Sequence, residues 1–217
     1  MKNIISSKLP KKPHLRLEKR YWDVGCNHVA GIDEVGRGAW AGPVVAASVV
    51  LPSNPDLIKK TLHDVRDSKC LTSEKRTRIS KMILQTALFT SVGVISSNEI
   101  DINGIISATR MAMCQAVNSL KQKPDQLLID AMDLHNDLSI PQNVMNFGDA
   151  ISLSIASASI IAKVYRDNLM IKLAKQYPGY GFESHKGYGT QMHYDRLMNL
   201  NVTPIHRKSF RPMVSLL

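Results

Sequence analysis

Residues 29–50 read VAGIDEVGRGAWAGPVVAASVV and predict two neighbouring strands. The runs 29–33 and 44–50 are short, apolar and rich in β-branched residues, as strands buried in a sheet are. The glycine-rich stretch between them lets the chain turn, so we expect a hairpin. The first run ends on two adjacent acids, Asp33 and Glu34, which would be unfavourable inside a sheet. This pair is therefore the first candidate for a functional site.

The hydrophobic period changes several times along the rest of the chain. From residue 72, apolar residues recur at helical spacing opposite a basic face, which predicts an amphipathic helix capped by Thr72 or Ser73. Further strands are predicted at 88–95, 126–130 and 144–147, and further helices at 105–120 and 152–176. The predicted buried positions of the first of these helices include Ile106, Met113, Val117 and Leu120. This order predicts an α/β domain with a mixed central sheet flanked by helices.

Composition divides the chain into three segments. Residues 1–27 form a basic arm with Pro10 and Pro13, which we expect to be solvated or partly ordered, with DNA binding as the alternative role. Residues 28–176 contain the predicted sheet and are expected to form the catalytic domain. Residues 177–217 are rich in Gly, His and aromatic residues, and we expect a small helical extension that binds substrate.

The charge balance points to a polyanionic partner. The 217 residues include 28 Lys and Arg against 18 Asp and Glu, a formal net charge of +10, and 44% are hydrophobic, enough for one domain with its own core. Basic residues exceed acidic ones by five in residues 1–28 and by six in residues 163–217. Residues 29–162 carry one acid more than they carry bases. Nucleic acid is the partner that this distribution favours.

Cysteine usage and the first residues indicate the compartment. The three cysteines form no C-x-x-C pair, which argues against a disulfide framework and against a structural zinc site. The first residues lack an apolar signal-peptide region, and no stretch reaches the ~20 apolar residues that a membrane helix needs. We expect a cytoplasmic monomer with no membrane partner.

Acids follow three of the predicted strands: Asp33 with Glu34, then Asp130, then Asp149. Strand ends that meet at one edge of an α/β sheet bring such acids together, and clustered carboxylates ionise together only with cations between them. Oxygen ligands of this kind suit Mg²⁺ or Mn²⁺, and two such ions about 3.5–4 Å apart would flank a scissile phosphate. The pattern predicts phosphodiester hydrolysis. In the alternative interpretation, Asp130 and Asp149 are turn or cap residues.

The turn at residues 36–43 lies directly after the first acids. Gly36, Arg37 and Gly38 would expose backbone groups to a sugar-phosphate chain, although the same residues also suit an ordinary tight turn. A dinucleotide-binding fingerprint is disfavoured because Ala41 stands where that motif has glycine and no helix follows.

Six blocks of this sequence closely resemble, in order, the motifs of bacterial ribonuclease HII. They are GIDEVGRG at 31–38 with AGPVVAA at 41–47, DSK at 67–69, LID at 128–130, GD at 148–149, SIASASIIAKV at 154–164 and HKGYGT at 185–190. The resemblance implies a ribonuclease H-like fold and cutting of the RNA strand in RNA–DNA hybrids, including single ribonucleotides embedded in duplex DNA. It further implies dependence on Mg²⁺ or Mn²⁺, and products with 5′-phosphate and 3′-hydroxyl ends.

The resemblance also assigns roles to residues. The four family acids fall on Asp33, Glu34, Asp130 and Asp149. The turn that contacts the 2′-hydroxyl falls on Gly36, Arg37 and Gly38, and the tyrosine that senses the RNA–DNA junction falls on Tyr188. The 2′-hydroxyl is the group by which a protein distinguishes RNA from DNA. The sequence departs from the family pattern at Ala39, Trp40, Cys70, Ala131 and Phe147, none of which replaces an acid.

Three basic residues are additional candidates for phosphate contacts: Lys69, Lys163 and Arg166. Lys69 could equally be a solvated loop lysine. Residues 157–159 are small, and we expect them to let the helix at 152–176 pack closely on the sheet.

Other functions also have to be considered. His185, His193 and His206 lack the spacing of a zinc site, and His185 is expected to orient the loop at 186–188. Other nucleases of the same fold, such as a Holliday-junction resolvase or a type HIII ribonuclease, would share the acids. A basic nucleic-acid binder without catalysis is the alternative from another class, although strand-end acids would repel its ligand.

Overall fold

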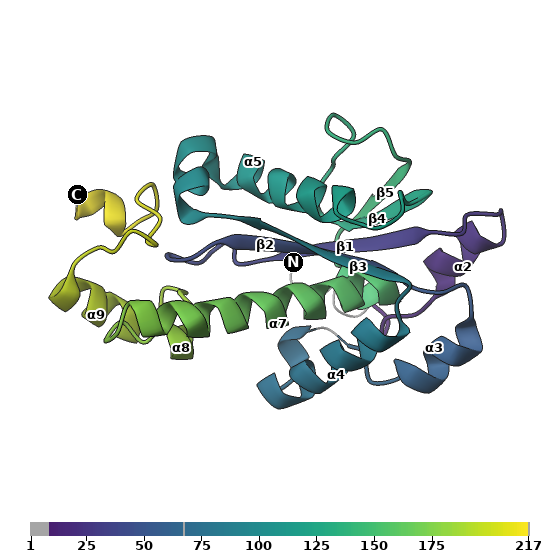
Figure 1. Cartoon of the computed structure of the whole chain (residues 1–217), viewed down its shortest axis with the longest axis horizontal. Helices are drawn as coiled ribbons and strands as arrows, with labels where there is room; N and C mark the ends of the chain where they lie inside the picture. Colours follow the sequence, from purple (N-terminus) through teal and green to yellow (C-terminus); the bar gives the residue numbers. More distant parts are fainter. Residues whose placement is uncertain (1–8, 67, 217) are drawn as a thin grey trace.

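The computed structural model describes residues 9–66 and 68–216 and contains one mixed β-sheet (Figure 1). The strands of this part of the chain are β1 (Val29–Val35), β2 (Val44–Val50), β3 (Phe89–Ile95), β4 (Gln126–Asp130) and β5 (Gln142–Met145). Their order across the sheet is β3-β2-β1-β4-β5. Strands β1, β2 and β3 pair antiparallel, whereas β4 and β5 run parallel to β1. The predicted hairpin and mixed sheet are confirmed.

Helices cover both faces of the sheet (Figure 1). The helices of the described residues are α2 (Arg16–Trp22), α3 (Pro55–Thr61), α4 (Ser73–Thr86), α5 (Ser97–Asn118), α6 (Gly148–Ile151), α7 (Leu153–Gln176), α8 (Phe182–His185) and α9 (Gln191–Leu200). One face lies under α5 and the other under α7, with α3 and α4 outside α7. Among the residues described, no helix combines the length and the apolar character that crossing a membrane requires.

The helix boundaries follow local capping. Thr72 caps α4 by accepting a hydrogen bond from the Lys75 N–H, as the sequence predicted. Helix α5 begins at Ser97, earlier than predicted, because Ser96 and Glu99 form a capping box. Gly104, with φ of 76°, interrupts α5. The prediction that Ile106 is buried is wrong, since its side chain is 62% exposed just after this interruption.

Strand β1 and helix α7 approach each other closely at Gly31. A Cβ atom on Gly31 would stand 2.2 Å from the backbone carbon of Ser154 in α7, so no larger residue fits there without moving the helix. Residues 157 and 158 on the same helix are fully buried, which confirms the expected packing role of the small residues. Helix α7 therefore lies close against β1, beneath the strand that carries the first two acids.

Within the segment expected to be a solvated or partly ordered arm, residues 16–22 form the packed helix α2. Leu17, Tyr21 and Trp22 contact a buried cluster that includes Leu128. A polar contact also fixes this helix at the start of α7, so its order comes from tertiary contacts more than from local propensity.

Glu18 is the polar anchor of α2. It is fully buried, and its Oε1 accepts hydrogen bonds from the Ser152 Oγ (2.6 Å), the Ser154 backbone N–H (2.9 Å) and the Ser154 Oγ (2.8 Å). These groups belong to the first turn of α7, where unpaired backbone N–H groups and the helix dipole favour a carboxylate. Glu18 thus joins the N-terminal segment to the central helix.

Replacement of this carboxylate tests the anchor. We expect Glu18→Ala to lower the free energy of unfolding by about 2–4 kcal/mol, because it leaves buried donors without an acceptor. Urea denaturation followed by circular dichroism measures the change. Arg20→Ala, an exposed change on the same helix, is the control and is expected to shift stability by less than about 0.5 kcal/mol. Equal stability of the Glu18 variant and the wild type would contradict this role.

Candidate active site

A cleft at one edge of the sheet contains three of the four predicted acids. It has a volume of about 330 Å³ and is lined by Asp33, Glu34, Val35, Ser68, Asp130, Ser159, Lys163 and Tyr188. These residues come from β1, β4, α7, the turn Ser68–Cys70 and the loop after α8. The cleft therefore unites segments that are far apart in the sequence.

Asp33 and Asp130 are neighbours across the parallel pair of β1 and β4. Ile32 pairs with Ile129 in this register, so the two aspartates follow side by side on the face that α7 covers. Asp33 is only 5% exposed, and its Oδ1 accepts the Glu34 N–H at 2.7 Å. Burial, reinforced by the charges of Glu34, Asp130 and Asp149, raises the pKa of Asp33 well above its ordinary value. This carboxylate is electrostatically unfavourable unless a positive charge joins it.

Glu34 faces a mixed environment at the end of β1. Burial raises the pKa of Glu34, and the guanidinium of Arg37, 3.4 Å from its Oε1, opposes that rise. The charge of Asp130 raises it further. Arg37 thus offsets part of the negative charge at the mouth of the cleft.

Asp149, the fourth acid, lies on α6 beside the cleft. It is 6% exposed, and its negative charge is one of the causes that raise the pKa of Asp33. The loop that holds it is tied to the cleft because the Gly148 N–H donates to the Asp130 Oδ1 at 2.8 Å. Within the described residues, no three Asp, Glu, His or Cys side chains already converge as a formed metal site.

The turn after β1 is held by a buried arginine that sequence reasoning did not identify. Arg207 is 0% exposed, and its guanidinium donates to the carbonyl oxygens of Gly36 (2.7 Å), Arg37 (2.7 Å) and Gly42 (3.1 Å). Gly36 has φ of 91°, a conformation that favours glycine. The three carbonyl groups point toward Arg207, and these hydrogen bonds fix the backbone of the turn beside the acids. The only sequence signal for Arg207 was its membership of the basic C-terminal segment.

Arg166 plays a similar part, which corrects its prediction as a substrate-binding residue. Its guanidinium is fully buried and donates to the carbonyl oxygens of Ala41 (3.0 Å), Pro43 (2.9 Å) and Lys186 (2.9 Å). Burial lowers the pKa of Arg166. It also lowers the pKa of Arg207, to about 9, so Arg207 remains charged at neutral pH. Part of the C-terminal positive charge is therefore internal structure rather than a surface for duplex binding.

The remaining candidates have different surroundings. Lys163 lines the cleft, and its Nζ lies 2.8 Å from Asp167 and 5.5 Å from the ring centre of Tyr188. Tyr188 also lines the cleft, with the Arg166 guanidinium 5.3 Å from its ring centre. The side chain of Lys69 lies outside the described residues. Ala131, at a position where the family commonly has glycine, has φ of 54° in the left-handed region.

The three histidines form a hydrogen-bonded network with the loops of the C-terminal segment. The His206 Nδ1 accepts the Thr203 N–H (2.9 Å), so its Nε2 carries the proton and donates to the His193 Nε2 (3.1 Å). His193 in turn donates through Nδ1 to the Tyr188 carbonyl oxygen (2.9 Å). His185 accepts the Gly187 N–H (3.2 Å), which holds the Tyr188 loop as the sequence predicted. These ring nitrogens are therefore engaged in positioning loops.

Comparison with known proteins decides the family. A family model described as Ribonuclease HII matches residues 30–213, which include all four acids and Arg207. The chain belongs to the ribonuclease HII family. It is 48% identical over 217 residues to the Ribonuclease HII of Ligilactobacillus salivarius (strain UCC118), covering 100% of this chain and 82% of that protein. Family membership makes it an endoribonuclease of ribonuclease H type 2, which acts on RNA–DNA hybrids.

Solved structures agree with this ribonuclease HII assignment. The ribonuclease H2 from Pyrococcus horikoshii OT3 superimposes with a TM-score of 0.73 and 25% identity, covering 87% of this chain and 96% of that chain. Bst-RNase HIII in complex with Mn²⁺ has a TM-score of 0.56 at 23% identity, over 71% of this chain and 56% of that chain, a likeness of fold. The predicted ribonuclease H-like fold and the predicted family are confirmed.

The buried arginine beneath the turn gives a stability prediction. We expect Arg207→Met to lower the free energy of unfolding by about 3–5 kcal/mol, because three carbonyl oxygens lose a charged donor. Lys208→Met is the matched control, since it removes the same charge from the adjacent, exposed position. Urea denaturation compares the two variants. An equal loss of stability in the two variants would show that only the net charge of the protein affects its stability, which would contradict this interpretation.

The histidine network gives a pH prediction. Burial lowers the pKa of His193 and of His206 to about 4, against an ordinary value near 6.5. The folded protein therefore binds fewer protons than the unfolded chain, and stability that is present above about pH 6.5 is lost as pH falls toward 4.

Unfolding midpoints between pH 7 and pH 5 test this interpretation. We expect the wild type to lose more stability over this range than the double variant His193→Gln/His206→Gln. His63→Gln, at an exposed histidine, is expected to keep the wild-type slope. Parallel curves for the wild type and the double variant would exclude the network as the source.

Proposed function

We propose that this ribonuclease HII cuts on the 5′ side of single ribonucleotides embedded in duplex DNA, as well as within RNA–DNA hybrids, and leaves 5′-phosphate and 3′-hydroxyl ends. The observation that carries the proposal is the placement of the four acids around one cleft beside the fixed turn at Gly36–Gly38. A surface evolved only to bind a polyanion would not bury carboxylates at this position. The proposal includes action as a cytoplasmic monomer, in keeping with three free cysteines.

The cleft has the donor chemistry of a site for hard divalent cations. Its acids supply carboxylate oxygens, and no His or Cys lines it within the part of the chain that the structure describes. Such a donor set suits Mg²⁺ or Mn²⁺ better than zinc. The Mn²⁺ complex of a ribonuclease HIII of similar fold supports the same class of ion. When bound, two ions would activate water and neutralise the leaving oxygen of the scissile phosphate.

The chain's own residues divide the remaining tasks. Asp33 and Asp130, adjacent in the sheet, would share the cations, and Glu34 and Asp149 would complete the ligand set. No side-chain nucleophile is required.

Recognition falls to the groups around the acids. Gly36, Arg37 and Gly38 would contact the 2′-hydroxyl. Hydrogen bonds from Arg207 to the carbonyl oxygens of Gly36 and Arg37 hold the backbone in the conformation from which this contact would be made. The ring of Tyr188, which lines the cleft, would stack on the deoxyribose that follows the ribonucleotide. Lys163 and Lys69 would contact neighbouring phosphates.

Replacement of Asp33, the most buried of the four candidate acids, tests the catalytic assignment. We expect Asp33→Asn to lower kcat/KM by about a thousandfold or more on a duplex that carries one ribonucleotide, because a cation ligand is lost. Its unfolding midpoint without metal is expected to equal or exceed that of the wild type, since the change removes carboxylate repulsion. Gel analysis of cleavage with Mg²⁺ and with Mn²⁺, together with thermal unfolding, provides the measurements.

Asp23→Asn is the control for loss of one exposed carboxylate and is expected to cut at the wild-type rate. Adding Mg²⁺ or Mn²⁺ should raise the unfolding midpoint of the wild type and of the Asp23 variant more than that of the Asp33 variant. Full activity of Asp33→Asn would overturn the catalytic assignment. Cleavage of a four-way junction in preference to the embedded ribonucleotide would favour a resolvase.

A further inference from the structure

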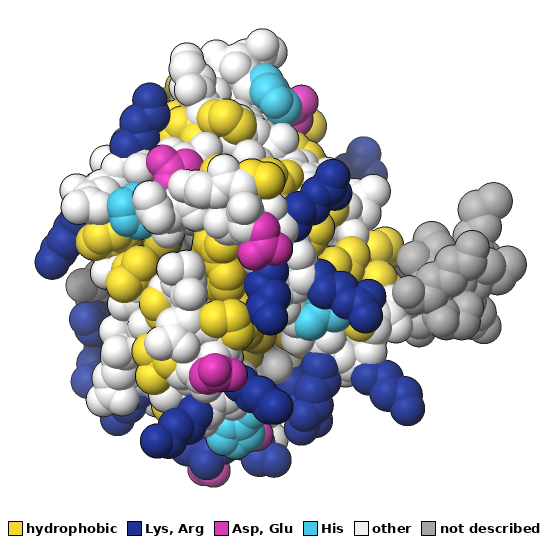
Figure 2. Space-filling model, turned by 90° about the vertical axis from the view of Figure 1, so that its right-hand side faces the viewer, with side chains coloured by type: hydrophobic (Ala, Val, Ile, Leu, Met, Phe, Trp, Pro, Cys, Tyr) yellow, Lys and Arg dark blue, Asp and Glu magenta, His cyan; other side chains and the backbone are white. Residues whose placement is uncertain are grey.

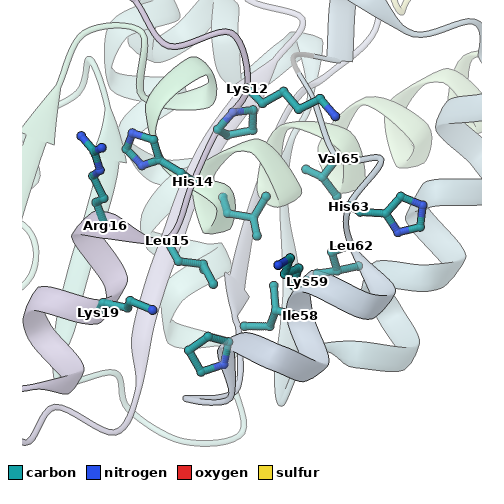
Figure 3. Close-up of a pocket in the computed structure, with 13 residues that line it drawn as sticks. Lys12, His14, Leu15, Arg16, Lys19, Ile58, Lys59, Leu62, His63 and Val65 are labelled. Carbon is teal, nitrogen blue, oxygen red and sulfur yellow. The ribbon is translucent and has the colours of Figure 1, made fainter.

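A second concave site lies between the N-terminal segment and α3 (Figure 3). It has a volume of about 350 Å³, within the range of ligand-binding sites in proteins. Residues 12–16 and 19 form one wall, and residues 55–65 form the other. We call this site the α2–α3 groove. It shares no lining residue with the carboxylate cleft.

Apolar side chains form the floor of the α2–α3 groove. Ile58, Leu62 and Val65 are each at most 2% exposed, and Leu153 at the start of α7 lies beside them. Leu15 projects toward them from the N-terminal segment (Figure 3). An apolar group of a ligand is stabilised when it leaves water to lie on such a floor, chiefly through burial of its own surface.

The wall formed by the N-terminal segment is fixed to the body of the protein. The His14 N–H donates to the Ile151 carbonyl oxygen (3.0 Å), and the His14 carbonyl oxygen accepts the Leu153 N–H (3.3 Å). The His14 Nδ1 is buried and has no hydrogen-bond partner in the structure. A buried polar atom without a partner is costly, so a ligand that reaches it would gain from pairing with it.

The rim carries positive charge. Lys12, Arg16, Lys19 and Lys59 all line the groove, and among the described residues no Asp or Glu does. Asp64, which follows the lining residue His63, is paired with Arg78 at 2.8 Å. Figure 2 views this end of the molecule, where Lys and Arg side chains surround apolar ones on the lower half of the face. The combination of an apolar floor and a cationic rim selects a ligand that is both acidic and apolar.

We propose that the α2–α3 groove binds an acidic peptide segment of a partner protein, with an apolar side chain of that segment on the Ile58–Leu62 floor. The carboxylates of the segment pair with Lys19, Lys59 and Lys12 at the rim. Charge complementarity of this kind fixes the orientation of a peptide and speeds its association. An apolar anchor in a pocket supplies most of the affinity of such a contact.

The shape of the groove favours a peptide over a duplex. A duplex presents its phosphates on a convex surface, with its bases stacked inside, so it can neutralise the rim but cannot cover an apolar floor. Because the groove and the cleft have separate linings, a docked peptide would leave the cleft open. The partner would thereby hold the ribonuclease near its substrate and raise the local concentration of enzyme.

Fluorescence anisotropy with a defined probe tests the proposal. The probe is a labelled peptide of three acidic residues followed by Leu-Leu-Phe, and its partner peptide carries glycines in place of the three apolar residues. We expect the wild-type protein to bind the first peptide at least about tenfold more tightly than the second, with affinity that falls as salt rises. The double variant Lys19→Glu/Lys59→Glu should lose at least about tenfold in affinity for the first peptide.

The matched control is Lys172→Glu/Lys175→Glu, which makes the same charge change at exposed positions far along α7. It should bind the peptide as the wild type does, and both double variants should cleave an RNA–DNA hybrid with unchanged kcat and KM. Equal affinity for the two peptides, or equal loss in both double variants, would overturn the proposal. A raised KM for the hybrid confined to Lys19→Glu/Lys59→Glu, with peptide binding unchanged, would instead identify the groove as a nucleic-acid contact.

Discussion

The close approach of α7 to β1 at Gly31 is the constraint on which the cleft depends. Two residues beyond Gly31 on the same face of the strand, Asp33 enters the narrow space between sheet and helix, where Ser159 of α7 forms a hydrogen bond with it. A larger residue at position 31 would lift the helix and admit water to the aspartate. The raised pKa of Asp33 is therefore a direct result of how tightly these two elements pack.

The charges around the cleft are arranged in two layers. The acids lie at the carboxyl ends of β1 and β4 and on α6, whereas Arg166 and Arg207 pair with carbonyl oxygens of the glycine turn and the neighbouring loop instead of with carboxylates. Each guanidinium is paired with neutral carbonyl groups, so its charge serves to fix the turn and the neighbouring loop. The site thus combines clustered carboxylates with internal cations that hold the adjacent backbone in place.

Much of the fold could be predicted from local sequence signals. The strand at 126–130 was predicted with the bounds that the structure has, and Thr72 was one of the two caps predicted for the helix that it begins, because these features depend on neighbours in the chain. The acids could be grouped because strand ends meet at one edge of a sheet.

The features that could not be predicted depend on distant partners. Helix α2 is held by Glu18, whose partners lie 134 and 136 residues away. Arg166 resembled a surface cation because its carbonyl partners at Ala41 and Pro43 lie more than 120 residues away. Nothing in the local pattern distinguishes a buried arginine of this kind from an exposed one.

The contact between Arg207 and the Gly36 carbonyl joins residues 171 positions apart. During synthesis, the acids of β1 leave the ribosome long before Arg207 has been added to the chain. A nascent chain of that length can pair β1 with β2, but its glycine turn lacks the guanidinium that fixes it. Under the proposed roles, the turn that would contact the ribose is therefore completed late in translation, and an unfinished chain would carry Asp33 and Glu34 before that turn is fixed.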